Sequence, residues 1–190
     1  MRNHRLGVQV VAAALWALLL AGPAWSRPEI EGPKKPPTVE ITPDQLAIGA
    51  ERLVLPAEYS AVVKALGEPS RRLPPQSQNE LIVWDTLGVL GYRSTVSGKI
   101  QLLTFYLASV PDRDYAPRQP FTGPIRIGTV VLDARSTLAE AGKGLLAQGA
   151  EHRSRLAFGV WNLRFGRFVI SLEQIDAATL QTVAVDTPAP

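Results

Sequence analysis

Apolar and polar residues alternate in short runs through most of the chain between residues 46 and 186, a period typical of strands that bury one face. The first run turns at Gly49, which predicts a β-hairpin. The next segment instead repeats its apolar residues every three to four positions, which predicts a helix that ends at Gly67. The apolar stripe of this helix consists of Tyr59, Val62, Val63 and Leu66.

A similar order of patterns returns later in the chain. Gly49 corresponds to Gly128, 79 positions further on, and the words VWDTLG (83–88) and VWNLRFG (160–166) also correspond. When these two segments are aligned, Trp84 corresponds to Trp161 and Asp85 corresponds to Asn162. We interpret the matches as two copies of one supersecondary unit.

Three strand-like runs follow each helix, and a capping box at Thr137 and Glu140 predicts the second helix. The run KIQLLTFYLA is apolar on both faces, so we place it at the centre of a sheet. The patterns predict an α+β fold, a two-layer sandwich whose antiparallel sheet carries two helices on one face, built from a tandem β-β-α-β-β-β repeat. The strand-like runs after the first helix are ELIVW, GVLGYRS and KIQLLTFYLA, and those after the second helix are LAFGVWNL, GRFVISLEQ and TLQTVAVD.

The amino terminus has the composition of a signal peptide. Arg2 and Arg5 precede an apolar run of 16 residues, and Ala24-Trp25-Ser26 fits the small-x-small cleavage rule. We therefore expect export, with cleavage after Ser26 or Ala24, and a periplasmic or secreted protein that does not insert into the membrane afterwards. The expected organisation is a signal peptide (1–26), a disordered proline-rich lead-in (27–40) and a single domain (41–187) of two repeats (41–110 and 124–187) joined by a proline-rich loop.

Charge and cysteine content narrow the classes of function. Loss of the leader removes two of the 20 basic residues and none of the 17 acidic ones, so the net charge falls from +3 to about +1 and gives no signal for nucleic-acid binding. The chain has no cysteine, which excludes disulfides, thiolate chemistry, thiolate metal sites and a lipidated cysteine.

Few residues suit catalysis or metal binding. His152 is the only histidine after the leader, and we interpret it as a solvated side chain near a helix end. The sequence contains no G-x-S-x-G, H-E-x-x-H or phosphate-loop motif. We therefore expect no enzyme activity, no cofactor and no metal.

Asp85 has two interpretations. The first is a turn former, because Asx side chains bond nearby backbone groups at strand corners. The alternative is a carboxylate-dependent hydrolase, in which Asp85 works with a second carboxylate such as Glu80 or Asp133.

The segment between the two units, ASVPDRDYAPRQPFTGPIRIG, also has two interpretations. It is either a rigid connector with Phe121 packed inward or a stiff loop that presents aromatic and arginine anchors, the residue types that dominate interface energetics. A second proline-rich segment, PSRRLPPQSQ (69–78), is interpreted as a solvated loop. The candidate protein-binding residues are Trp84, Tyr92, Tyr106, Arg113, Tyr115, Arg118 and Phe121.

Three motifs occur in a fixed order: L-G-x-P-S-R (66–71), V-W-D-x-L-G-x-x-x-Y (83–92) and P-F-x-G-x-I-x-I (120–127). They resemble an uncharacterised family of bacterial domains, many from exported proteins, over about residues 46–132. The resemblance implies fold more than function. In general shape the arrangement is similar to beta-lactamase inhibitor proteins and small outer-membrane assembly lipoproteins, which use helix-plus-sheet units as binding surfaces. The missing lipidated cysteine is a departure from the lipoproteins.

These observations favour a non-catalytic exported module that binds another protein. The most concrete version is an inhibitor- or immunity-like protein that sterically neutralises an enzyme or toxin in the periplasm. A cell-envelope assembly or structural factor is the first alternative, and the hydrolase that uses Asp85 is the second.

Overall fold

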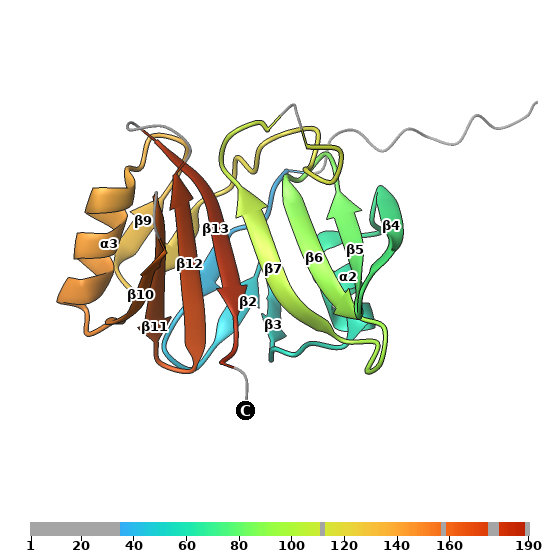
Figure 1. The fold of residues 1–190 in the computed structure, drawn as a ribbon, viewed down its shortest axis with the longest axis horizontal. Helices are drawn as coiled ribbons and strands as arrows, with labels where there is room; N and C mark the ends of the chain where they lie inside the picture. The colour runs from blue at the N-terminus through green and yellow to red at the C-terminus, as the bar shows by residue number, and fades with distance from the viewer. Residues whose placement is uncertain (1–34, 111–112, 157–158, 175–178, 189–190) are drawn as a thin grey trace, which may run out of the picture. The chain divides into compact units, whose positions relative to one another are not determined.

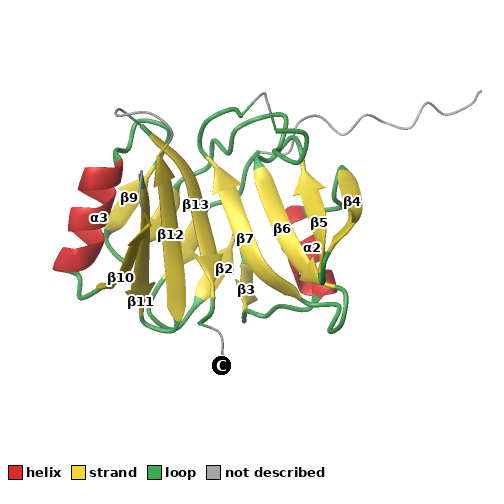
Figure 2. Ribbon diagram, viewed as in Figure 1, coloured by secondary structure: helices red, strands yellow, loops and turns green. Residues whose placement is uncertain are grey.

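The computed structural model describes residues 35–110, 113–156, 159–174 and 179–188, and the predicted signal peptide lies outside them. In this part of the chain the strands form one sheet of five and one of eight, accompanied by two helices (Figures 1 and 2). The strands are β1 (Val39–Ile41), β2 (Leu46–Ile48), β3 (Glu51–Leu53), β4 (Arg71–Gln76), β5 (Asn79–Trp84), β6 (Val89–Ser94), β7 (Ile100–Tyr106), β8 (Ile125–Ile127), β9 (Val130–Leu132), β10 (Glu151–Leu156), β11 (Val160–Phe165), β12 (Phe168–Gln174) and β13 (Leu180–Asp186). The helices are α2 (Tyr59–Leu66) and α3 (Leu138–Ala147).

The large sheet is antiparallel, in the order β10-β11-β12-β13-β7-β6-β5-β4. Its middle is the pair of β7 and β13, in which Phe105 lies opposite Val183. The central position predicted for KIQLLTFYLA is therefore confirmed. That strand is apolar on both faces because the two faces meet different buried clusters.

The small sheet has the order β3-β2-β1-β8-β9. Two hairpins, each turning at a glycine with positive φ, are joined through β1, which pairs with β2 in antiparallel and with β8 in parallel orientation. In Figure 1 this sheet lies behind the large one, and its two hairpins use the turns that Gly49 and Gly128 provide.

The sequence correctly predicts where α2 ends and where α3 begins. Val62 and Leu66 of α2 are buried, and Gly67 follows at a φ of 84°. At the start of α3 the hydroxyl of Thr137 accepts a hydrogen bond from the backbone N–H of Glu140 at 3.2 Å, so the predicted cap is confirmed.

The main core lies between the two sheets. Its large buried side chains include Trp84, Phe105 and Phe168 of the large sheet and Ile41 and Ile48 of the small one, and both helices add apolar residues to it. The opposite face of the large sheet, which we call the outer face, carries a second, smaller buried cluster. Its buried members are Leu81, Val83, Leu90, Tyr106 and Ala116.

The expected single-sheet sandwich is wrong, although the mixed α+β character is confirmed. The structure has a second sheet, because β1 joins two hairpins that were expected to extend the first sheet. β1 also begins at Val39, inside the segment 27–40 for which no regular structure is expected.

Two further strands, β4 and β10, are absent from the sequence prediction. β4 has the sequence RRLPPQ and β10 has the sequence EHRSRL, and apolar and polar residues do not alternate in either strand. Both are edge strands of the large sheet, where prolines and charges block further strand pairing, so they lack the pattern that identifies a half-buried strand.

The second Trp-Asx pair does not repeat the environment of the first. Trp84 ends β5 and Asp85 begins the turn to β6, whereas Trp161 and Asn162 lie inside β11. Asn162 is not a turn former, because its side-chain oxygen accepts a hydrogen bond from Ser171 across the strand pair at 2.7 Å. The Trp-Asx pair therefore forms a strand-to-strand turn at residues 84–85 but not at residues 161–162. The tandem repeat itself stays a prediction.

Candidate functional site

Two of the predicted binding residues lie in the main core. Trp84 is 1% exposed and its indole N–H donates to the carbonyl of Gly67 at 2.8 Å, so it faces α2. Phe121 is 2% exposed and packs edge-on against Phe105 at 5.2 Å between ring centroids. The connector interpretation of Phe121 is thus correct, and neither ring can contact a partner directly.

Four other predicted residues come together on the outer face. Tyr92 comes from β6 and Tyr106 from β7, while Arg113 and Tyr115 belong to the loop that follows β7. We call these four residues the tyrosine patch. The guanidinium of Arg113 lies over the ring of Tyr115, 5.9 Å from its centroid.

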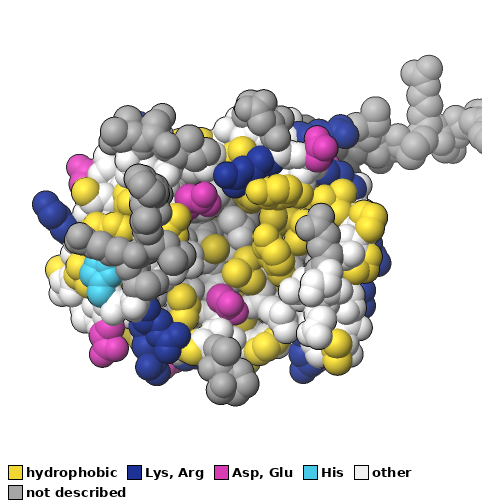
Figure 3. Space-filling view, in the orientation of Figure 1, with side chains coloured by type: hydrophobic (Ala, Val, Ile, Leu, Met, Phe, Trp, Pro, Cys, Tyr) yellow, Lys and Arg dark blue, Asp and Glu magenta, His cyan; other side chains and the backbone are white. Residues whose placement is uncertain are grey.

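The tyrosine patch is layered. Tyr106 is 4% exposed and packs with the buried apolar residues beneath it, whereas Tyr92 and Tyr115 are half-buried and Arg113 is exposed. Figure 3 shows hydrophobic side chains gathered over β5–β7 on this side of the molecule. The patch therefore offers tyrosine rings and one guanidinium on a packed base.

The phenols of Tyr92 and Tyr106 stay protonated at neutral pH. Burial raises the pKa of Tyr106, and the neighbouring phenols of Tyr115 and Tyr92 raise it further. Burial likewise raises the pKa of Tyr92, and the carboxylate of Glu173 on β12 raises it slightly more. These side chains can therefore donate hydrogen bonds to a partner, and Glu173 is a neighbour that sequence reasoning did not find.

The outer face over β12 and β13 is more polar. Besides the bond between Ser171 and Asn162, the hydroxyl of Thr182 donates to the carboxylate of Glu173 at 3.2 Å. Asp186 is half-buried on β13 opposite Val169. The face thus divides into an apolar half over β5–β7 and a polar half over β11–β13.

A hydrogen-bonded clamp holds the loop between β7 and β8, residues 107–110 and 113–124, which we call the cover loop. Arg71 donates to both oxygens of Asp85, at 2.9 Å from Nε to Oδ2. It also donates to the carbonyls of Asp114 (2.6 Å) and Ala116 (2.7 Å). Asp85 in turn accepts from the backbone N–H of Arg118 at 3.1 Å.

The clamp joins the first two sequence motifs by hydrogen bonds. Arg71 ends the first motif and Asp85 belongs to the second, while Ser70 accepts a hydrogen bond from the backbone N–H of Asp85. Phe121 of the third motif donates its backbone N–H to Tyr106 at 2.6 Å. Arg71 was missed as a site residue because it lies in a segment interpreted as a solvated loop, although its place in the motif was a usable signal.

The carboxylates proposed for hydrolysis are each engaged in different ion pairs. Asp85 is buried and bound to Arg71, Glu80 pairs with Arg93 at 3.0 Å, and Asp133 pairs with Arg135 at 3.2 Å. The turn interpretation of Asp85 is too narrow, because its side chain bonds a loop 33 positions away. His152 lies in β10, exposed, with its ring 5.0 Å from that of Trp161.

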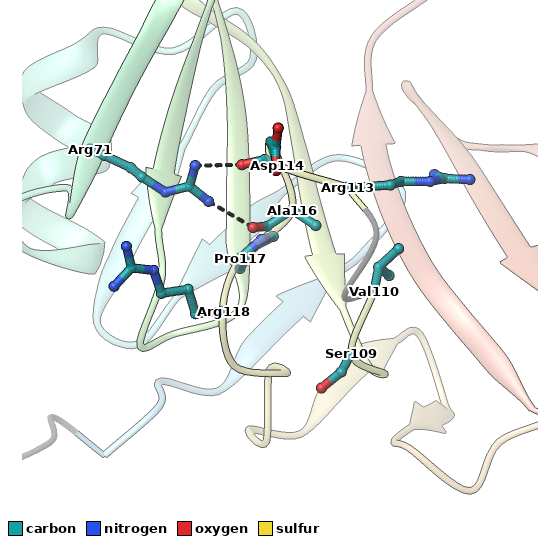
Figure 4. A pocket seen from close by; sticks show the side chains of 8 residues that line it. All are labelled: Arg71, Ser109, Val110, Arg113, Asp114, Ala116, Pro117 and Arg118. Carbon is teal, nitrogen blue, oxygen red and sulfur yellow. Dashed lines mark hydrogen bonds between the residues drawn. The ribbon is translucent and has the colours of Figure 1, made fainter.

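Arg118 lines a recess beside the clamp. The recess has a volume of about 610 Å³. Figure 4 shows the guanidinium groups of Arg71 and Arg118 on one side of it and that of Arg113 pointing away. The side chain of Arg118 is 80% exposed, and its Nε lies 3.8 Å from Oδ2 of Asp85. The lining residues are Arg71, Ser109, Val110, Arg113, Asp114, Ala116, Pro117 and Arg118.

The described residues contain neither a cluster of metal ligands nor a helix that could span a membrane. No three histidine, cysteine, aspartate or glutamate side chains within them lie close enough together to hold a metal ion. Among those same residues, no helix has the length and hydropathy needed to span a bilayer.

We expect Asp186→Asn to be more stable than the native chain at about pH 7, with the difference shrinking towards about pH 4. Burial raises the pKa of the Asp186 carboxyl above its usual value, against a smaller opposing effect of the hydrogen bond from Thr187. The folded chain therefore binds this proton more readily than the unfolded chain. The ionised form costs stability above the folded pKa, and the cost is relieved as the pH falls through it.

Urea unfolding at both pH values measures this effect, and Asp133→Asn is the control of opposite sign. Hydrogen bonds from the backbone and side chain of Arg135 lower the pKa of Asp133, so its contribution to stability is present at neutral pH and is lost in acid. A difference between Asp186→Asn and the native chain that does not change with pH would contradict the prediction.

Comparison with known proteins gives a family and little about function. A family model described as a domain of unknown function (DUF7738) matches residues 38–142. No curated protein matches the chain. One similar solved structure is a DUF4309 family protein (YjgB) from Bacillus subtilis subsp. subtilis str. 168, at 14% identity over 76% of this chain and 88% of that one. Its TM-score of 0.43 is too low to support an argument.

The family match covers the clamp, the cover loop, Tyr92 and Tyr106. The specific motif pattern and the likeness to inhibitor proteins stay predictions, since the match is described only as a domain of unknown function. Because the match spans more than half of the 190 residues, the chain belongs to the DUF7738 family.

Proposed function

We propose that the chain is a non-catalytic exported module that binds another protein through the tyrosine patch. Its most concrete form is an inhibitor- or immunity-like protein that occludes the site of an enzyme or toxin in the periplasm. The observation that carries the proposal is the convergence of Tyr92, Tyr106, Arg113 and Tyr115 on one face of the large sheet.

The composition of the patch supports binding to protein. Tyrosine and arginine are enriched at the energetic centres of interfaces, because they combine a large contact area with hydrogen-bond donors. Tyr106 is nearly inaccessible, so its role is to support the exposed members and to keep them in place. Tyr92, Arg113 and Tyr115 are the residues expected to contact the partner.

The rigidity of the patch supports a steric mechanism. The clamp at Arg71 and Asp85 fixes the loop that carries Arg113 and Tyr115 before any partner arrives. A surface that is ordered in advance loses less conformational entropy on binding. Occlusion of an enzyme by such a surface needs no catalytic group from the inhibitor.

The test is capture of a partner by the tagged chain, residues 27–190, from periplasm and culture supernatant. A partner that binds this surface should bind the variant carrying both Tyr92→Ala and Tyr115→Ala at least about tenfold more weakly, because interface anchors each contribute more than about 1 kcal/mol.

Tyr59→Ala is the matched control. Tyr59 is also half-buried with a guanidinium over its ring, that of Arg72 at 5.0 Å, but it packs against the main core. This variant should bind the partner as the native chain does, and the unfolding free energies of all variants should be compared. Equal binding by the native chain and the double variant would remove the tyrosine patch from consideration.

A further inference from the structure

Two guanidinium groups, those of Arg71 and Arg118, flank the recess beside the clamp. Arg113 also lines it but points away (Figure 4), and Asp114 is the one acidic residue in that lining. The carboxylate of Asp85 lies beside both arginines. Its Oδ2 is 2.9 Å from Nε of Arg71 and 3.8 Å from Nε of Arg118. One carboxylate cannot satisfy the donors of two guanidinium groups, each of which carries five N–H bonds.

The two arginines differ in what they have left to offer. Arg71 is held by Asp85 and by the carbonyls of Asp114 and Ala116, so its position is fixed and most of its donors are used. Arg118 has a fixed backbone, since its N–H donates to Asp85, but its side chain is 80% exposed. The donors available to a ligand are therefore chiefly those of Arg118.

The size and lining of the recess suit a small anionic group. A volume of about 610 Å³ is within the range of small-molecule sites. Ser109 supplies a hydroxyl at the wall, and Val110 and Pro117 supply apolar surface. Arginine binds carboxylate and phosphate oxygens in pairs, because its planar donors match their spacing.

We infer that this recess binds an oxyanion, a carboxylate or phosphate group, with Arg118 as the main contact and Arg71 as the fixed charge beside it. The ligand is either a free small anion or an acidic segment of another protein, and the chemistry at Arg118 is the same in both cases. The inference does not depend on the proposed protein partner, because it can be tested on the purified chain alone.

The experiment is an NMR titration of the ¹⁵N-labelled chain at constant ionic strength with three probes: inorganic phosphate, citrate and a capped tetraglutamate peptide. Constant ionic strength is needed because salt screens exposed charges. The backbone N–H groups of Arg118 and Gln119 donate to Asp85 and report directly on the recess. At least one probe should shift these signals in a saturable manner.

Arg118→Ala should weaken that binding about tenfold, the usual effect of losing a charged hydrogen-bonding pair. Arg126→Ala, which removes an exposed arginine from β8 of the small sheet, should leave the affinity unchanged. Binding of phosphate or citrate would identify a free anion as the ligand, and binding of the peptide alone would identify an acidic protein segment. Absence of saturable shifts with all three probes, or equal affinities of the two variants, would overturn the inference.

Discussion

Replacing Asp85 with alanine is expected to lower the free energy of unfolding by about 3 kcal/mol, the lower end of the cost of breaking a buried ion pair. The side chain of Asp85 is 9% exposed and that of Arg71 is 24% exposed, so water can compensate the stranded guanidinium only in part. The backbone N–H of Arg118 would also lose its acceptor. The effect should therefore combine lost stability with a loosened cover loop.

Urea unfolding measures the first effect, and hydrogen exchange at Arg118 and Gln119 measures the second. Asp133→Ala is the matched control, because Asp133 also pairs with an arginine, but with side chains 45% and 92% exposed. Exposed pairs contribute little, so this variant should stay within about 1 kcal/mol of the native chain. If both variants lost the same small amount, the clamp would have no special role in stability.

Replacing Gly88 with alanine is expected to cost about 3 kcal/mol, from two sources that add. Gly88 has a φ of 70°, a region that alanine adopts only with strain. A β-carbon at this position would also lie 2.1 Å from the backbone nitrogen of Phe121. That nitrogen donates to Tyr106, so the cover loop cannot move away without losing this hydrogen bond.

Gly98→Ala separates the two sources. Gly98 has nearly the same φ, 71°, but its nearest neighbour would be the side-chain end of Arg93 at 3.5 Å. This variant should lose about 1 kcal/mol, the conformational cost alone. Thermal or urea unfolding of both variants gives the comparison, and equal losses would show that the loop does not press on Gly88.

The regular elements were predictable where local periodicity determines them. Val62 and Leu66 define the buried stripe of α2, and Thr137 caps α3 as its spacing to Glu140 requires. The hairpin at Gly49 follows from alternation around a residue that readily adopts positive φ. In each case a few neighbouring residues contain all the information that is needed.

The second sheet was not predictable in this way. β1 pairs with β8, which places Val39 opposite Ile125, and no local pattern encodes a pairing over that separation. The edge strands β4 and β10 lack alternation because prolines and charges serve to block pairing there. The rule that finds half-buried strands therefore fails at the edges of the sheet.

The candidate site, too, could be predicted from the sequence only in part. Residue type indicated tyrosine and arginine anchors, and four of the seven predicted residues do meet on the outer face. Residue type could not tell that Trp84 points to the opposite face, because alternation fixes which residues share a face but not which face meets the core. The role of Arg71 depends on contacts 43 and 45 positions away in sequence.

The pairing of β7 with β13 has a consequence for the order of folding. β7 lies at the middle of the large sheet, yet its second neighbour is the last strand along the described chain. During synthesis the apolar strand β7 would wait, with one edge unpaired, until residues 182–185 had emerged. The nascent chain would therefore be open to aggregation and to proteases at this strand edge until residues 182–185 have emerged.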